Sequence, residues 1–220
     1  MSPKGYTSAP GDAAPVKVPD THWEDLARLD PEDVRLRSGG TIDAGGGYRL
    51  PFLNTEIIVD TTDRRLRANR GDGAEIIDDP LLELILLVYL KHAADIDPAS
   101  RMAAAKELKE GHFFTGVHAL DVARVVEMYG RNPDGFAAAA EALGGLRESH
   151  ADVSYRLPAL PRVPLYYLLW EGDEDFEPNI TVCFDRTIEH HFAADAIWGL
   201  VKRVSYALVE KGSGTGDCAL

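Results

Sequence analysis

The sequence has few cysteines, no excess of basic residues and no long apolar run. Its two cysteines are too few for an iron–sulfur cluster, which normally takes four thiolates, and they do not suggest a disulfide framework. Cys183 lies in the apolar run 180–184 and is expected in the core, whereas Cys218 lies in a glycine-rich end. No stretch reaches the roughly 20 apolar residues of a membrane span, and residues 1–19 lack the apolar centre of a secretion signal. We therefore expect a cytoplasmic protein.

Acidic residues outnumber basic ones. There are 36 Asp and Glu against 23 Lys and Arg, which gives a formal net charge of -13 and a pI of about 4.9. A field of this sign repels phosphate backbones and anionic lipid headgroups, so no nucleic acid and no membrane surface is expected as a partner. The arginine-rich stretch 64–70 is a local exception, which we interpret as a solvated turn between strands, with an anion site as the alternative.

Signatures of common active sites are also missing. The chain has no Gly-x-Ser-x-Gly elbow, no Walker loop, no His-Glu-x-x-His and no Cys-x-x-Cys. Their absence lowers the expectation of an enzyme and leaves open whether the protein is one.

The composition is that of one globular domain. Hydrophobic residues make up 45% of the chain and charged residues 27%, the usual balance for a single core. Residues 1–19 are rich in Pro, Gly, Ala and Ser and are expected to form a disordered arm. Residues 212–220 are expected to form a flexible tail, which leaves one domain over 20–211.

Helices are predicted from cap residues and apolar periodicity. Thr21 with Glu24 has the pattern of a capping box, and Asp30 before Pro31 marks the start of a second short helix. Residues 81–94 are apolar on nearly every face, which predicts a fully buried helix at the centre of the core. Further helices are expected over 97–111, 118–129, 133–143 and 193–209.

Strands are predicted from short runs of β-branched, aromatic and aliphatic residues. Runs 48–53 and 55–60 predict a small antiparallel sheet near the N-terminus. Runs 163–170 and 180–184 predict two buried strands joined by the acidic connection 171–178. The predicted fold class is α+β: a small antiparallel N-terminal sheet, a helical middle with one fully buried helix, and a C-terminal β-hairpin with a closing helix.

Several motifs resemble a known family over about residues 30–210. They are Leu160-Pro161-Arg162-Val163-Pro164-Leu165, Leu169-Trp170-Glu171-Gly172-Asp173-Glu174-Asp175-Phe176, Phe184-Asp185 and Ala194-Asp195-Ala196-Ile197-Trp198, with Lys106-Glu107-Leu108, Gly111-His112-Phe113-Phe114, His118 and Gly144-Gly145 upstream. The chain is similar to domain-of-unknown-function family 3786. The resemblance implies a place in anaerobic metabolism, because members occur mainly in anaerobic bacteria and archaea. Some members carry an iron–sulfur domain of the type found in corrinoid proteins of one-carbon metabolism. The resemblance thus implies corrinoid or tetrapyrrole chemistry but carries over no site residue, and this chain lacks the cysteine-rich domain.

The acidic connection is the first candidate site. Glu171, Asp173, Glu174, Asp175 and Glu177 supply enough oxygen ligands for Ca²⁺ or Mg²⁺, although their spacing is not that of an EF-hand. The interpretation that we favour is a solvated hairpin whose charges prevent edge-to-edge pairing.

The second candidate is an aromatic segment with two histidines. His112 and His118 flank Phe113 and Phe114, and their imidazoles suit a transition metal or an axial position on a corrinoid or haem. With Trp170, these residues form the predicted ligand-binding set. The alternative is that one histidine caps a helix and the other is exposed.

A metal site is predicted from His112, His118, Asp185 and His190. His190 and His191 are expected on an extended stretch, where neighbouring side chains point to opposite faces, so that only one joins the site. No pair has a familiar zinc spacing. The leading hypothesis is a binding or accessory protein for a small-molecule ligand, with a corrinoid, haem or a divalent metal as candidate cofactors. The alternatives are a metal-dependent hydrolase or transferase that uses these residues, and a subunit that presents the acidic hairpin to a protein partner.

Overall fold

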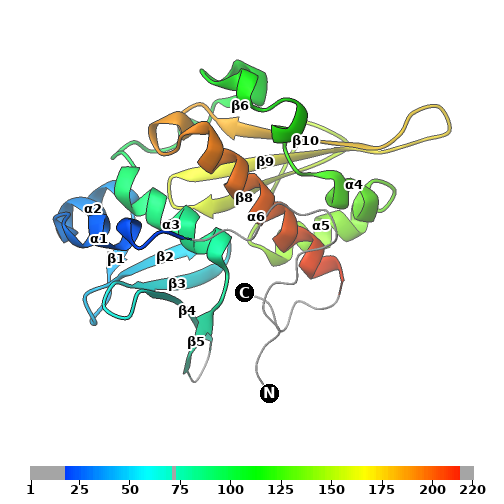
Figure 1. The fold of residues 1–220 in the computed structure, drawn as a ribbon. Helices are drawn as coiled ribbons and strands as arrows, with labels where there is room; N and C mark the ends of the chain where they lie inside the picture. The colour runs from blue at the N-terminus through cyan, green and yellow to red at the C-terminus, as the bar shows by residue number, and fades with distance from the viewer. Residues whose placement is uncertain (1–17, 71–72, 214–220) are drawn as a thin grey trace.

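A computed structural model describes residues 18–70 and 73–213 and shows two sheets flanked by helices (Figure 1). The first sheet is a meander of five antiparallel strands in sequence order: β1 (Thr41–Ile42), β2 (Tyr48–Phe52), β3 (Thr55–Asp60), β4 (Arg65–Arg70) and β5 (Gly73–Ile77). The expected two-stranded N-terminal sheet is therefore larger than predicted. No helix in the described ranges is long and apolar enough to span a membrane.

The second sheet is also antiparallel and has the order β6-β10-β9-β8-β7. Its strands are β6 (Met102–Ala104), β7 (Leu146–Glu148), β8 (Val153–Leu160), β9 (Val163–Trp170) and β10 (Asn179–Asp185). The predicted hairpin is confirmed, because β9 and β10 pair antiparallel from Leu165↔Phe184 to Trp170↔Asn179. It forms the centre of this sheet, and Cys183 on β10 is buried as expected, which raises the pKa of its thiol.

Within the described ranges, six α-helices accompany the sheets: α1 (Thr21–Ala27), α2 (Pro31–Ser38), α3 (Pro80–His92), α4 (Ala123–Tyr129), α5 (Pro133–Ala142) and α6 (Ala194–Gly212). Four short 3₁₀ turns complete the described part of the chain: η1 (Ala105–Glu107), η2 (Gly111–Phe113), η3 (Gly116–His118) and η4 (Ile188–His190). The predicted α+β class is confirmed. The arm and tail expected at the two ends lie almost wholly outside the described residues, and α6 itself continues to Gly212.

Two predicted caps have different outcomes. Asp30 caps α2 as expected, with its carboxylate accepting the N–H groups of Glu32 and Asp33. The capping box at Thr21 is wrong: Thr21 lies inside α1, and no side chain caps that helix.

The helix predicted over 97–111 is also wrong. The Asp185 carboxylate at the end of β10 accepts the N–H groups of Ala99 and Arg101, and Ser100 between them has a positive φ of 54°. These bonds hold the segment extended, so that residues 102–104 pair with β10 as an edge strand. Of the helix predicted over 118–129, only α4 is α-helical.

The arginine-rich stretch is a strand and not a turn. Arg64 lies in the turn after β3, and the rest of the stretch forms β4. Arg67 pairs with Asp60 and Asp63 at 2.7 Å each, and Arg65 lies 3.9 Å from Asp63. These arginines therefore have acidic partners within the chain.

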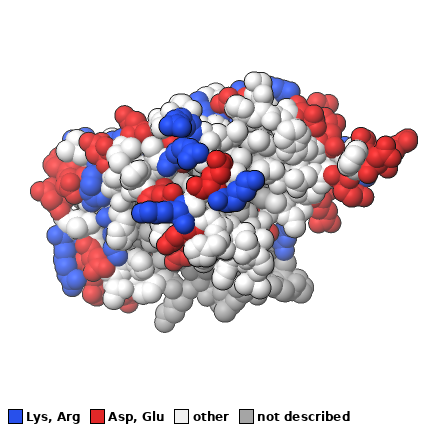
Figure 2. All heavy atoms as spheres, turned by 90° about the horizontal axis from the view of Figure 1, so that it is seen from above, with Lys and Arg blue, Asp and Glu red and all other residues white. Residues whose placement is uncertain are grey.

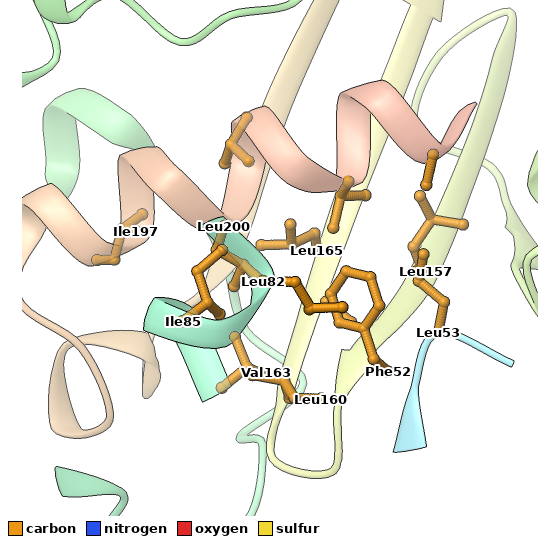
Figure 3. Close-up of a cluster of buried hydrophobic side chains, with 14 of the residues drawn as sticks. Phe52, Leu53, Leu82, Ile85, Leu157, Leu160, Val163, Leu165, Ile197 and Leu200 are labelled. Atoms are coloured by element: carbon orange, nitrogen blue, oxygen red, sulfur yellow. The ribbon is translucent and has the colours of Figure 1, made fainter. Parts of the chain in front are cut away.

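One hydrophobic core joins the two sheets through α3 and α6, which contact each other. Figure 3 shows its centre, where the labelled side chains from both sheets and both helices meet: Phe52, Leu53, Leu82, Ile85, Leu157, Leu160, Val163, Leu165, Ile197 and Leu200. The backbone N–H of Leu53 donates to the carbonyl of Ala159 at 3.2 Å, which links β2 to β8 directly. A buried ion pair between Arg203 and Asp79 ties α6 to the first turn of α3.

Candidate functional site

Helix α3 is less fully buried than predicted, because Leu81, Leu84 and Val88 are only half-buried. The surface of α3 that does not enter the core borders an open groove of about 1440 Å³. Its floor and walls come from α3, the 113–123 segment, η4 with the residues that follow it, and the first half of α6. We call it the histidine groove, because five of the seven histidines of the chain line it: His22, His92, His118, His190 and His191.

The groove is apolar inside. Ile85 and Phe192 are buried beneath it, while Leu81, Leu84 and Val88 of α3 are half-buried along its wall. Gly199 faces Leu81 and Ile85 where α6 approaches α3, and a Cβ there would lie 3.4 Å from Leu81 Cδ1. A concave apolar surface with polar groups around it has the general form of a ligand site.

The wall opposite α3 is built by the aromatic segment predicted from the sequence. Phe114 is buried and packs on Phe184 of β10, with ring centroids 6.2 Å apart. Phe113 contacts Phe114 edge-on and stacks under His118 at 4.5 Å. Trp198 of α6 fixes this wall from the other side, because its Nε1 donates to the Ala119 carbonyl at 3.1 Å.

The predicted ligand-binding residues are thus brought together in part. Phe113 and His118 line the histidine groove, and Phe114 supports them from the core. His112 is exposed and does not line the groove. Trp170 lies at the end of β9, is 43% exposed and does not line the groove either.

The predicted metal ligands are not assembled. His118 and His190 line the same groove, but in the described ranges no group of three or more His, Cys, Asp or Glu side chains is arranged to hold a metal ion. Asp185 is buried and accepts four hydrogen bonds, two from Thr187 and one each from Ala99 and Arg101. Burial alone would raise the pKa of this carboxyl, but these hydrogen bonds hold it below its usual value. Asp185 therefore has a structural role, because it holds Ala99, Arg101 and Thr187 at the end of β10.

Sequence reasoning missed His191. The chain at 188–190 is a 3₁₀ turn and not an extended stretch, and it leaves His190 exposed while His191 is only 1% exposed. The Nδ1 atom of His191 accepts the N–H of Ala94, just beyond α3, at 3.3 Å. Burial, with the charge of Arg162, lowers the pKa of His191 to about 4. The apolar neighbour Phe192 was the one sequence signal that pointed to a buried ring.

The acidic connection between β9 and β10 projects from one end of the molecule (Figures 1 and 2), as expected for a solvated hairpin. All five of its Asp and Glu residues are exposed. The Asp173 carboxylate accepts the N–H groups of Asp175 and Phe176 at 2.8 and 2.7 Å and so closes the turn.

Fold and site together define an α+β protein of two five-stranded antiparallel sheets with an apolar, histidine-lined groove beside its two main helices. The chain belongs to the family described as Domain of unknown function (DUF3786), whose model matches residues 30–207. No curated protein and no solved structure matches the chain.

Proposed function

We propose that the protein is a binding protein that holds a large, mostly apolar ligand in the histidine groove. The observation that carries this proposal is the groove itself, about 1440 Å³ in volume and walled by aliphatic and aromatic side chains. Sites for drug-sized molecules are usually about 300–1,000 Å³, so the expected ligand is larger than these. A tetrapyrrole with an apolar macrocycle, such as haem, is of this class. A corrinoid, to which the company of family members points, has a ring of similar size but carries polar amide side chains.

The exposed apolar surface at the mouth of the groove also supports binding. Val117 follows Gly116, which has a positive φ of 59°, and its side chain is 91% exposed. Lys202 lies on the α6 side with its ammonium 5.4 Å from the Trp198 ring. An apolar ligand that entered between them would cover Val117 and contact Trp198.

The test is a titration of the purified protein with cobinamide, haem and protoporphyrin IX, followed by absorption and by tryptophan fluorescence. Leu84→Glu places a charge on the groove wall and is expected to weaken binding at least about tenfold, because the carboxylate must be desolvated under the ligand. Leu146→Glu is the matched control, since Leu146 is 55% exposed on the edge strand β7, outside the groove. Binding by none of these probes, or equal binding by Leu84→Glu and the parent, would overturn the proposal.

A second measurement uses the protein as it is isolated. Its absorption spectrum and metal content after purification without oxygen are expected to reveal a co-purified chromophore if a tetrapyrrole is the natural ligand. Leu84→Glu, purified in the same way, is expected to carry less of it.

A further inference from the structure

The protonation of the His191 ring follows from its contacts. Because Nδ1 accepts the Ala94 N–H at 3.3 Å, its lone pair is in use and it carries no proton. Burial keeps the ring neutral at pH 7, since the pKa is lowered to about 4. The one proton of the neutral ring therefore resides on Nε2, which makes this atom a hydrogen-bond donor.

This donor has no acceptor within the protein. Among the described residues, two buried side-chain nitrogens have no hydrogen-bond partner, Nε2 of His191 and Nε of Arg162. Of these two residues, only His191 lines the histidine groove. Buried donors without a partner are rare, because leaving one unsatisfied is costly to stability.

The N-terminus of α6 supplies further donors beside the same ring. The helix begins at Ala194, three residues after His191; its N-cap residue Ala193 makes no side-chain cap, and the Asp195 carboxylate accepts the N–H of Ala196. The first N–H groups of a helix lack partners inside the helix, and its dipole favours negative charge there. Ala193 and Asp195 line the groove at this end.

The carboxylates at this end are already engaged. Glu189 accepts the Lys109 N–H at 2.7 Å, and Asp195 accepts the N–H of Ala196 at 2.8 Å. Lys202, two turns along α6 from Asp195, adds a positive charge to the groove lining. Hydrogen-bond donors are thus concentrated where His191 meets the start of α6, and the carboxylates of Glu189 and Asp195 keep their negative charge beside them.

We propose that the ligand of the histidine groove carries a carboxylate, which docks at the start of α6 and accepts the Nε2–H of His191 while the apolar body lies along α3. This inference rests on the proposed function and narrows its ligand class to an apolar molecule with an acidic group. Because Nε2 is enclosed, the side chains beside the ring must shift to admit the ligand oxygen. Fatty acids and tetrapyrroles with propionate arms both combine an apolar body with a carboxylate.

The experiment compares acids with their esters. Protoporphyrin IX is titrated against its dimethyl ester, and dodecanoate against methyl dodecanoate, with the intact protein. The parent is expected to bind the acid of at least one pair about tenfold more tightly than its ester, a difference of about 1.4 kcal/mol. The pair that shows the preference identifies the source of the carboxylate.

Two variants separate the donor from the fold. His191→Asn keeps an acceptor at the δ position for the Ala94 N–H but has no donor at the ε position, and it is expected to abolish the preference for the acid. His191→Gln keeps a donor at the ε position and is expected to retain most of it. Thermal melting of both variants, and ¹⁵N spectra of the imidazoles in the parent, show whether the ring and its surroundings are intact.

The outcomes distinguish this inference from the proposed function. If the parent binds acid and ester alike, and Leu84→Glu weakens both, the groove binds apolar ligands and the carboxylate inference is wrong. If acid preference persists unchanged in folded His191→Asn, His191 is not the donor and the inference fails. If the parent binds no acid or ester of either pair, and none of the titrated cofactors, both proposals fail.

Discussion

The two sides of α3 are built from the same residue types but lie in different surroundings. Leu82 and Leu86 are completely buried against the core, whereas Leu84 and Val88 are half-buried along the histidine groove. Their amino acids do not distinguish them, since both sets are aliphatic. The difference is set by their neighbours: Leu82 and Leu86 face the core, whereas Leu84 and Val88 border the groove beside α6 and the 113–123 segment.

Neighbouring residues elsewhere show the same division. On α6, Arg203 is buried in an ion pair with Asp79, while the preceding Lys202 lines the groove. Beyond η4, His191 is buried and His190 is exposed. In each pair, one residue is buried, and its neighbour of similar chemistry is more exposed and lines the groove. The two members therefore serve as matched controls.

The largest effect is expected on α3. Leu86→Asp should abolish folding, because an unpaired charge in the core costs several kcal/mol, which is comparable to the whole stability of a domain. Leu84→Asp, two residues away, should fold, because its carboxylate can reach the water of the groove. Soluble yield and thermal melting of the two variants test this directly. Normal melting of Leu86→Asp would show that the two sides of α3 do not differ as described.

Much of the fold was predictable from local signals. Asp30 before Pro31 marks a helix start that the structure confirms, and the apolar runs of β9 and β10 are buried as predicted. The failures have tertiary causes. Residues 99–104 are extended because Ala99 and Arg101 bond to Asp185, more than 80 residues away in sequence, and such a partner leaves no local pattern.

The candidate site was predictable only in part. Phe113 and His118 are close in sequence, so the stacking of their rings arises within one short segment. The groove also needs α3, η4 and α6, and no spacing in the sequence shows that these segments meet. Trp170 was included for its aromatic character, but β9 carries it to the far end of the sheet.

A smaller effect is expected at the buried ion pair. Arg203→Met removes the partner of Asp79, a residue that also accepts the Leu82 N–H at the start of α3. Breaking a buried pair costs about 3–5 kcal/mol, and the low end applies because the Asp79 side chain is 18% exposed. Lys202→Met removes a cation that lies over Trp198 and Tyr206, a type of contact worth about 0.5–1 kcal/mol at exposed sites, and should cost less than Arg203→Met. Urea unfolding of both variants measures the two losses of unfolding free energy. Equal losses would show that the buried ion pair contributes no more than the groove lysine.

The smallest effect is expected from mild acid, between about pH 7 and about pH 5, acting on His191. Its pKa in the folded protein is about 4, against about 6.5 for an unfolded chain. Between these values the unfolded state binds a proton that the folded state excludes. The free energy of unfolding therefore decreases as the pH is lowered, by up to about 1.4 kcal/mol per pH unit. This loss begins below about pH 6.5 and levels off below about pH 4.

His191→Gln lacks the titrating ring, so its unfolding free energy should decline less steeply than that of the parent between about pH 7 and about pH 5. His190→Gln alters the exposed neighbour and is the matched control for the loss of a histidine at this turn. Parallel curves for His191→Gln and the parent would mean that the ring is not held neutral in the fold, and the buried donor on which the carboxylate inference rests would be lost with it.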